Sequence, residues 1–264
     1  MGRLFTFGCS FTMWPWPTWS DIMAHELKLP YQNWAIPGLG NVGIASRVLE
    51  CDLLNNFTKD DIILIVWSTW TREDRFRINK YPGHGWTCTG DVHYAYDKSF
   101  IDNYCSLNND LYKNSTAIIQ TNRLYKDNIK FNGHMTVPLI QEYENKELAF
   151  DEDELELTKF YIDHVPNDGD FGSYQCSYAQ INEGHPDVLT HLKYAVEVVA
   201  PKMNHVFSQE SIYYFTNIHN SISQFCLTED LAHGVDYRLK IQNYLIKEWD
   251  WFQAHYHGFM WGTK

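Results

Sequence analysis

The chain lacks the features that bring a protein to nucleic acid or into a membrane. Its 33 acidic residues outnumber its 21 Lys and Arg residues, the formal net charge is −12, and no basic stripe is present. A nucleic-acid-binding surface normally needs the reverse balance. No apolar run reaches the length of a membrane span, and no basic region followed by an apolar core begins the chain. We therefore expect neither nucleic-acid nor membrane partners, no signal peptide, and a cytoplasmic location.

Cysteine and metal-ligand patterns are also missing. The six cysteines are scattered without a C-x-x-C pair, so we expect free, mostly buried thiols rather than a disulfide framework. His84, His93, His134 and the His255–His257 pair provide no three ligands at a recognisable metal-binding spacing. The sequence therefore predicts no metal site and no cofactor.

What the chain does have is a large apolar fraction, 44%, in alternating strand and helix patterns. Ile62–Trp67 is a continuous apolar run, which indicates a strand buried on both faces, as in a parallel sheet. The acidic run Asp151–Glu156 indicates a solvated loop or the start of a helix. The pattern predicts an α/β domain with a mostly parallel sheet over residues 1–200 and an aromatic-rich helical extension over residues 201–264.

Local signals place the individual elements. Ser20 is a good N-cap for a helix with Asp21 in its first turn, and Pro201 is expected to end a late helix. Residues 73–100 are irregular and are interpreted as a long loop or lid. Strands are expected at 3–7, 31–35, 62–67 and 129–137, and helices at 20–27, 42–55, 100–125 and 187–200, the second helix burying Ile44, Val48, Leu49 and Leu53.

A first candidate site follows the first predicted strand. Gly8-Cys9-Ser10 forms a Gly-x-Ser turn at the carboxyl end of that strand, the edge at which parallel sheets bind ligands. A serine there can act as a nucleophile, and the backbone amides around it can receive an anion. The alternative is that Ser10 only caps a turn.

A second, glycine-rich segment, Asn33–Asn41, follows the second predicted strand. Gly38 allows the backbone to approach a ligand closely and to turn an amide inward, although an ordinary turn is the alternative. Gly38, Gly40 and Gly43 also match a dinucleotide fingerprint. No acidic residue follows a second strand at the distance that this motif needs, which argues against a nucleotide.

The third segment is His185-Pro186, in a loop directly before a predicted helix. A histidine that the fold brings beside Ser10 can act as general base for acyl transfer. A capping or surface role is the alternative, because the chain has twelve histidines.

In their order and spacing, the three segments resemble the SGNH hydrolase superfamily, also called GDSL-type esterases and lipases. Phe7–Thr12 stands in for the Gly-Asp-Ser block, with Cys9 in place of the Asp, while Ile36–Gly38 and His185–Ala195 look like the second and final blocks. The resemblance covers residues 3–200 and implies a three-layer α/β/α sandwich with a flavodoxin-like sheet. The aromatic-rich loop after the first block is similar to that of phage and marine microbial members, so a phage-associated location is the alternative to a cytoplasmic one.

The resemblance also implies roles for single residues. Ser10 would be the nucleophile and His185 the base, and the amides of Ser10 and Gly38 would help to form an oxyanion hole. The family's Asp before the histidine corresponds to Asn182, which can hold the ring but cannot stabilise imidazolium as a carboxylate does. The family's third-block Asn is missing, and the candidates to replace it are Ser68, Thr69, Arg72 and Asn41.

The leading hypothesis is a serine esterase whose substrate is a small ester or an acylated carbohydrate, with acetyl as one acyl group. The residues expected to contact the substrate are then Trp14, Trp16, Thr69 and Arg72. The two tryptophans would stack on sugar rings; the alternative is that they only pack their own loop. The alternative is a non-catalytic binding or structural module, for example in a phage particle. Its surface for a protein partner would be the aromatic segment Tyr244–Trp261.

Overall fold

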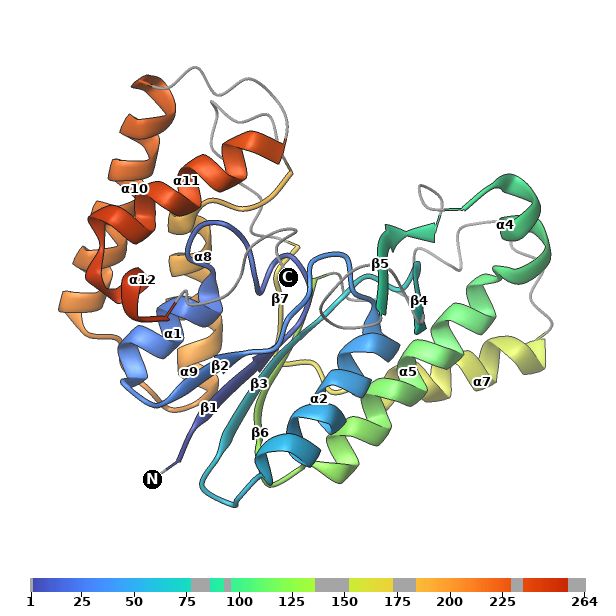
Figure 1. Ribbon diagram of the computed structural model, residues 1–264. Coiled ribbons are helices and arrows are strands. Elements are labelled where there is room, and N and C mark those ends of the chain that lie inside the picture. The colour runs from blue at the N-terminus through green and yellow to red at the C-terminus, as the bar shows by residue number, and fades with distance from the viewer. Residues whose placement is uncertain are drawn as a thin grey trace.

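The computed structural model describes residues 2–76, 86–92, 96–135, 152–172, 184–228 and 235–255. Five strands form one sheet in the order β2-β1-β3-β6-β7, and each pair of neighbours is parallel (Figure 1). The predicted α/β class with a parallel sheet is confirmed. The strands are β1 (Leu4–Phe7), β2 (Tyr31–Asn33), β3 (Ile62–Trp67), β6 (Ile129–His134) and β7 (Gly169–Asp170).

The centre of the sheet is buried on both faces because its residues alternate between two apolar cores. Leu64 and Val66 of β3 lie in one core, whereas Ile63, Ile65 and Trp67 lie in the other, and all are fully buried. Burial on both faces requires apolar residues at every position, which explains why this strand is a continuous apolar run in the sequence.

Helices cover both faces of the sheet (Figure 1). α2 (Asn41–Asn55) and α5 (Leu107–Leu124) lie on one face, and α7 (Glu152–Asp163) packs against α5. α1 (Trp19–Leu27) and α8 (Val188–Tyr194) lie on the other face, and α10 (Gln209–Thr228) packs against both. The acidic run therefore opens a helix, one of its two predicted roles.

The first helix begins earlier than predicted. Thr18, rather than Ser20, is the N-cap of α1, because the Asp21 carboxylate accepts a hydrogen bond from the Thr18 amide at 2.8 Å and closes a capping box. Ser20 lies inside the helix, where its hydroxyl donates to the carbonyl of Thr12 at 2.7 Å. This bond ties the loop after β1 to the start of α1.

Two residues assigned to the buried face of α2 are exposed. Leu49 and Leu53 are 48% and 73% exposed, whereas Ile44, Val48 and Cys51 are fully buried. Cys51 follows Val48 by three positions and so completes the buried stripe that the two leucines were expected to form.

The expectation of an irregular segment over residues 73–100 is wrong in part. β4 (Arg72–Phe76) and β5 (Trp86–Asp91) form a two-stranded antiparallel sheet, and α4 (Lys98–Tyr104) begins soon afterwards. Residues 77–85 and 93–95 lie outside the described residues.

One predicted helix, over residues 100–125, is two helices. Ser106 separates α4 from α5 and caps the latter, because its hydroxyl accepts a hydrogen bond from the Asn109 amide at 3.2 Å.

The helix predicted to end at Pro201 continues through it. α8 passes into a π-helical turn, η1 (Ala195–Val199), and then into α9 (Ala200–Lys202), which contains the proline. Proline has no amide hydrogen, and its ring crowds the carbonyl four residues earlier. A wider π turn directly before Pro201 accommodates both constraints.

The described residues after 208 are mostly helical and include α11 (Val235–Glu248) and α12 (Asp250–His255). The loop before α10 is joined to α1 by a polar contact. The Glu26 carboxylate accepts hydrogen bonds from His205 Nε2 at 2.8 Å, and from the amide and hydroxyl of Ser208 at 2.9 and 2.7 Å. These three residues are called the α1–α10 junction below.

Two predictions concern the chain as a whole. Within the described residues, no helix combines the length and the apolar character needed to cross a bilayer. The described cysteines Cys9, Cys51, Cys105 and Cys226 are free thiols, as predicted.

Candidate active site

Ser10 lies in a tight turn at the carboxyl end of β1. The carbonyl of Cys9 accepts hydrogen bonds from the amides of Thr12 at 3.0 Å and Met13 at 3.1 Å, which closes the turn around Ser10. Gly8 permits this path, because a Cβ atom there would lie 2.1 Å from the Thr12 hydroxyl oxygen. The serine is 6% exposed and stands at the edge where parallel sheets bind ligands.

A second turn brings Gly38 to the same edge. Ile36–Leu39 form a type II turn, closed by a hydrogen bond of 3.1 Å from the Leu39 amide to the Ile36 carbonyl. Its third residue, Gly38, has a φ of 83°, which this turn type requires. The Ile36 amide donates to the carbonyl of Gly8 at 3.2 Å, so the segments that carry Gly38 and Ser10 are paired just before these residues.

Two backbone donors at this edge have no partner. Within the described residues, the amides of Ser10 and Gly38 donate no hydrogen bond, and the hydroxyl of Ser10 makes none either. Ser10 is buried, and most buried backbone N–H groups are paired, whereas Gly38 is half-buried and its amide can meet solvent or a ligand. Two amides of this kind can stabilise an oxygen atom that gains negative charge during a reaction at Ser10.

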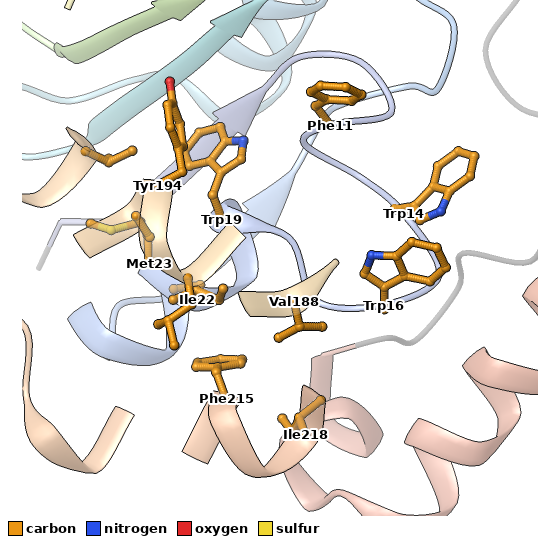
Figure 2. Close-up of a cluster of buried hydrophobic side chains, with 14 of the residues drawn as sticks. Phe11, Trp14, Trp16, Trp19, Ile22, Met23, Val188, Tyr194, Phe215 and Ile218 are labelled. Atoms are coloured by element: carbon orange, nitrogen blue, oxygen red, sulfur yellow. The ribbon is translucent and has the colours of Figure 1, made fainter. Parts of the chain in front are cut away.

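His185 reaches the same edge from the loop before α8. Its ring stacks on Trp14 with 3.5 Å between centroids and meets Phe11 edge-on at 5.9 Å. The Trp16 indole nitrogen donates to the carbonyl of Pro186 at 2.8 Å, which holds the backbone beside the histidine. Figure 2 shows Phe11, Trp14 and Trp16 on the loop after β1, so one loop makes all these contacts.

The two predicted catalytic residues, Ser10 and His185, make no hydrogen bond to each other. Phe11, which contacts the His185 ring, directly follows Ser10, but the Ser10 hydroxyl has no hydrogen-bond partner within the described residues. Catalytic hydrogen bonds are often long in ligand-free enzymes and shorten when substrate binds. Asn182, the residue expected to orient His185, lies outside the described residues.

Two other buried histidines are poorly suited to accept a proton near neutral pH. Burial first, and the charge of nearby His185 second, lower the pKa of His191 to about 3. Burial also lowers the pKa of His134, although its Nε2 donates to the Pro166 carbonyl at 2.9 Å. Neither ring competes with His185 for the role of base.

The four candidates for the missing third-block Asn differ in what they contact. The Asn41 side chain accepts from the Ser68 amide at 2.7 Å and donates to the Ser68 carbonyl at 3.3 Å, so it holds the loop after β3. The Ser68 hydroxyl is buried without a partner, and Thr69 is half-buried. Arg72 begins β4 and points its Nη1 at the Leu39 carbonyl. Which of them replaces the Asn stays a prediction.

Trp14 and Trp16 are buried, with 3% and 1% of their surface exposed, so neither offers an open face for a sugar ring in this structure. The two rings meet edge to face at 6.0 Å, and the Arg238 guanidinium of α11 lies 4.6 Å from the centre of Trp14. The packing alternative therefore fits these tryptophans better than sugar stacking. Arg238 also shows that α11 reaches the edge of the site, which no sequence pattern indicated.

The start of α2 is closed by a carboxylate of the protein itself. Asp74 of β4 accepts hydrogen bonds from the amides of Gly40 at 2.7 Å and Gly43 at 2.8 Å, two of the positions that match a dinucleotide fingerprint. A helix N-terminus binds an anion in this way. A nucleotide phosphate would need the place that Asp74 holds, so the glycines have a structural role here.

No three His, Cys, Asp or Glu side chains gather as a metal site within the described part of the chain. Of the histidines weighed as ligands, His84, His93 and His257 lie outside that part.

Comparison with known proteins assigns no family to this site: no protein-family model matches the chain, and no curated protein matches it.

Proposed function

We propose that the chain is a serine acyl hydrolase of the SGNH type, in which Ser10 attacks an ester carbonyl and His185 carries the proton. The observation that supports it most is that, within the described residues, the amides of Ser10 and Gly38 and the hydroxyl of Ser10 all lack a hydrogen-bond partner. Such an arrangement suits acyl transfer, because the oxygen of the tetrahedral intermediate needs fixed donors.

The mechanism follows from these positions. The Ser10 hydroxyl attacks the carbonyl carbon while His185 accepts its proton, and the two amides stabilise the oxyanion. His185 then gives the proton to the leaving alcohol, and water releases the acyl group by the same steps. In this structure His185 stacks on Trp14 and makes no hydrogen bond to Ser10, so that bond would have to form when substrate binds.

The test is hydrolysis of p-nitrophenyl acetate by wild type, Ser10→Ala and His185→Ala. We expect both variants to lose at least ~1,000-fold in kcat/KM. Ser46→Ala is the matched control, because that hydroxyl donates to the Val42 carbonyl on α2 and should not affect the rate. Labelling with a fluorophosphonate, followed by mass spectrometry, should place the modification on Ser10.

A second candidate is a non-catalytic binding module. The stacking of His185 on Trp14, together with the absence of a bond from Ser10 to any described residue, favours it. On this proposal wild type hydrolyses p-nitrophenyl acetate at the background rate, and the fluorophosphonate leaves Ser10 unmodified.

A further inference from the structure

Arg72 places a guanidinium group at the edge that carries Ser10. Its Nη1 donates to the carbonyl of Leu39 at 3.0 Å, and Leu39 directly follows Gly38. On its other side, Nη2 lies 3.9 Å from the sulfur of Met135, and that sulfur is 3.2 Å from Cys9 Sγ. The guanidinium therefore contacts Leu39, which follows Gly38, and is linked through Met135 to Cys9, which precedes Ser10.

One edge of this guanidinium has no adequate acceptor. Nε is buried and has no hydrogen-bond partner, and Nη2 has only the Met135 thioether, which is a weak acceptor. Nε and Nη2 lie side by side in arginine and form the fork that binds both oxygens of a carboxylate. A cation with two such donors in a partly buried position is unfavourable unless an acceptor arrives.

No carboxylate of the described residues forms an ion pair with Arg72. The charge of Arg72 does act on Asp74, where it favours the ionised carboxylate and so opposes the rise in pKa that burial causes. Asp74, the acid two positions further along β4, is held by the amides of Gly40 and Gly43. Arg75 differs in this respect, because its Nε lies 3.5 Å from the Glu73 carboxylate. Among the described residues, the fork of Arg72 therefore has no carboxylate partner.

A ligand would reach the fork by displacing Met135. Arg72 as a whole is half-buried, but its Nε is buried. Met135 is also half-buried, and a methionine side chain changes rotamer at little cost, so its sulfur can give way to an oxygen.

We propose that Arg72 binds a carboxylate of the substrate, so that the preferred substrates are acyl esters of alcohols that carry an acidic group. This inference rests on the proposed acyl hydrolase function and deepens it by naming a substrate class. Arg72 would position the alcohol part while Ser10 attacks the acyl carbonyl.

The test compares two acetyl esters of the same shape, 4-acetoxybenzoate and 4-acetoxybenzamide, which differ in charge. Wild type should have a higher kcat/KM for the acidic ester than for the amide-bearing ester. Arg72→Gln should lower the ratio of these two kcat/KM values about 10- to 100-fold, toward a ratio of one. Arg72→Lys keeps the positive charge but not the two parallel donors, so its kcat/KM ratio should lie between those of wild type and Arg72→Gln. Arg75→Gln removes the same charge from the same strand and should keep the wild-type preference.

A binding measurement separates failure of this inference from failure of the proposed function. Calorimetric titration of Ser10→Ala with benzoate and with benzamide needs no turnover. We expect benzoate to bind more tightly, and the difference to vanish when Arg72→Gln is added to Ser10→Ala. Equal binding of the two probes, or a preference that survives Arg72→Gln, overturns the inference whether or not the wild type hydrolyses esters. Absence of hydrolysis with Arg72-dependent benzoate binding overturns the esterase proposal alone.

Discussion

The α1–α10 junction and the edge around Ser10 both hold polar groups at buried or half-buried positions, but they differ in how these groups are paired. At the junction, the Glu26 carboxylate is matched by three donors from His205 and Ser208. At the edge, the amides of Ser10 and Gly38 and Nε of Arg72 have no partner within the described residues. Polar groups that hold a fold together are normally paired, and buried exceptions need a reason. The contrast supports a ligand-binding role for the edge and a structural role for the junction.

The difference between the two regions can be tested by removing one charged side chain from each and comparing the losses in stability. Glu26→Ala leaves the donors of His205 and Ser208 without their acceptor, and we expect the free energy of unfolding to fall by about 2–3 kcal/mol. Arg72→Gln should change it by less than about 1 kcal/mol, because only the Leu39 carbonyl loses a donor. Urea denaturation at pH 7 measures both. Equal losses would show that Arg72 is also a structural residue.

The junction should also make the protein sensitive to acid. Burial opposes ionisation of Glu26, but hydrogen bonds from the start of α10 and from His205 outweigh it and lower its pKa from 4.5 to about 2. A carboxyl whose pKa is lower in the folded state stabilises the fold above its ordinary pKa and loses that contribution as the pH falls. The free energy of unfolding should therefore decline between about pH 4.5 and 2.

Glu26→Gln provides the control for this titration. Since Gln does not ionise, the decline over the same pH range should be shallower than in wild type, as measured by urea denaturation at successive pH values. An identical pH dependence in both proteins would assign the acid sensitivity to other carboxyl groups.

The elements that local chemistry determines were predictable from the sequence. The strand Ile62–Trp67 has the predicted bounds, because burial on both faces leaves no polar residue in it. The start of α1 was misplaced because Thr18 and Ser20 are both good caps. The choice depends on Asp21 bonding to the Thr18 amide, which the sequence does not specify.

The features of the candidate site also differ in whether a local sequence signal predicts them. The turns that hold Ser10 and Gly38 were predictable because a Gly-x-Ser turn and a Pro-Gly turn have local signatures at strand ends. Arg238 was missed because its contact with Trp14 depends on how α11 packs, for which a single arginine gives no signal. Asp74 was missed for a similar reason, since it closes the start of α2 from a different element.

The smallest expected effect concerns the contact between α11 and the site. The Arg238 guanidinium lies 4.6 Å from the centre of Trp14, and Trp14 stacks on His185. A cation over a tryptophan ring contributes about 0.5–1 kcal/mol. Arg238→Ala also removes a hydrogen bond of 3.0 Å from Nε to the Tyr237 hydroxyl, so the free energy of unfolding should fall by about 1–2 kcal/mol. If Trp14 positions His185, hydrolysis of p-nitrophenyl acetate should also fall, by about two- to fivefold.

Two further variants decide what this contact does. Arg238→Lys keeps a cation near the ring and should recover part of both losses, whereas Lys247→Ala, at an exposed position of the same helix, should cause neither. A fall in stability with an unchanged rate would mean that α11 only braces the loop after β1. A fall in rate at unchanged stability would instead mean that Arg238 acts on the reaction directly. The edge around Ser10, whose polar groups lack partners among the described residues, would then include a residue of α11.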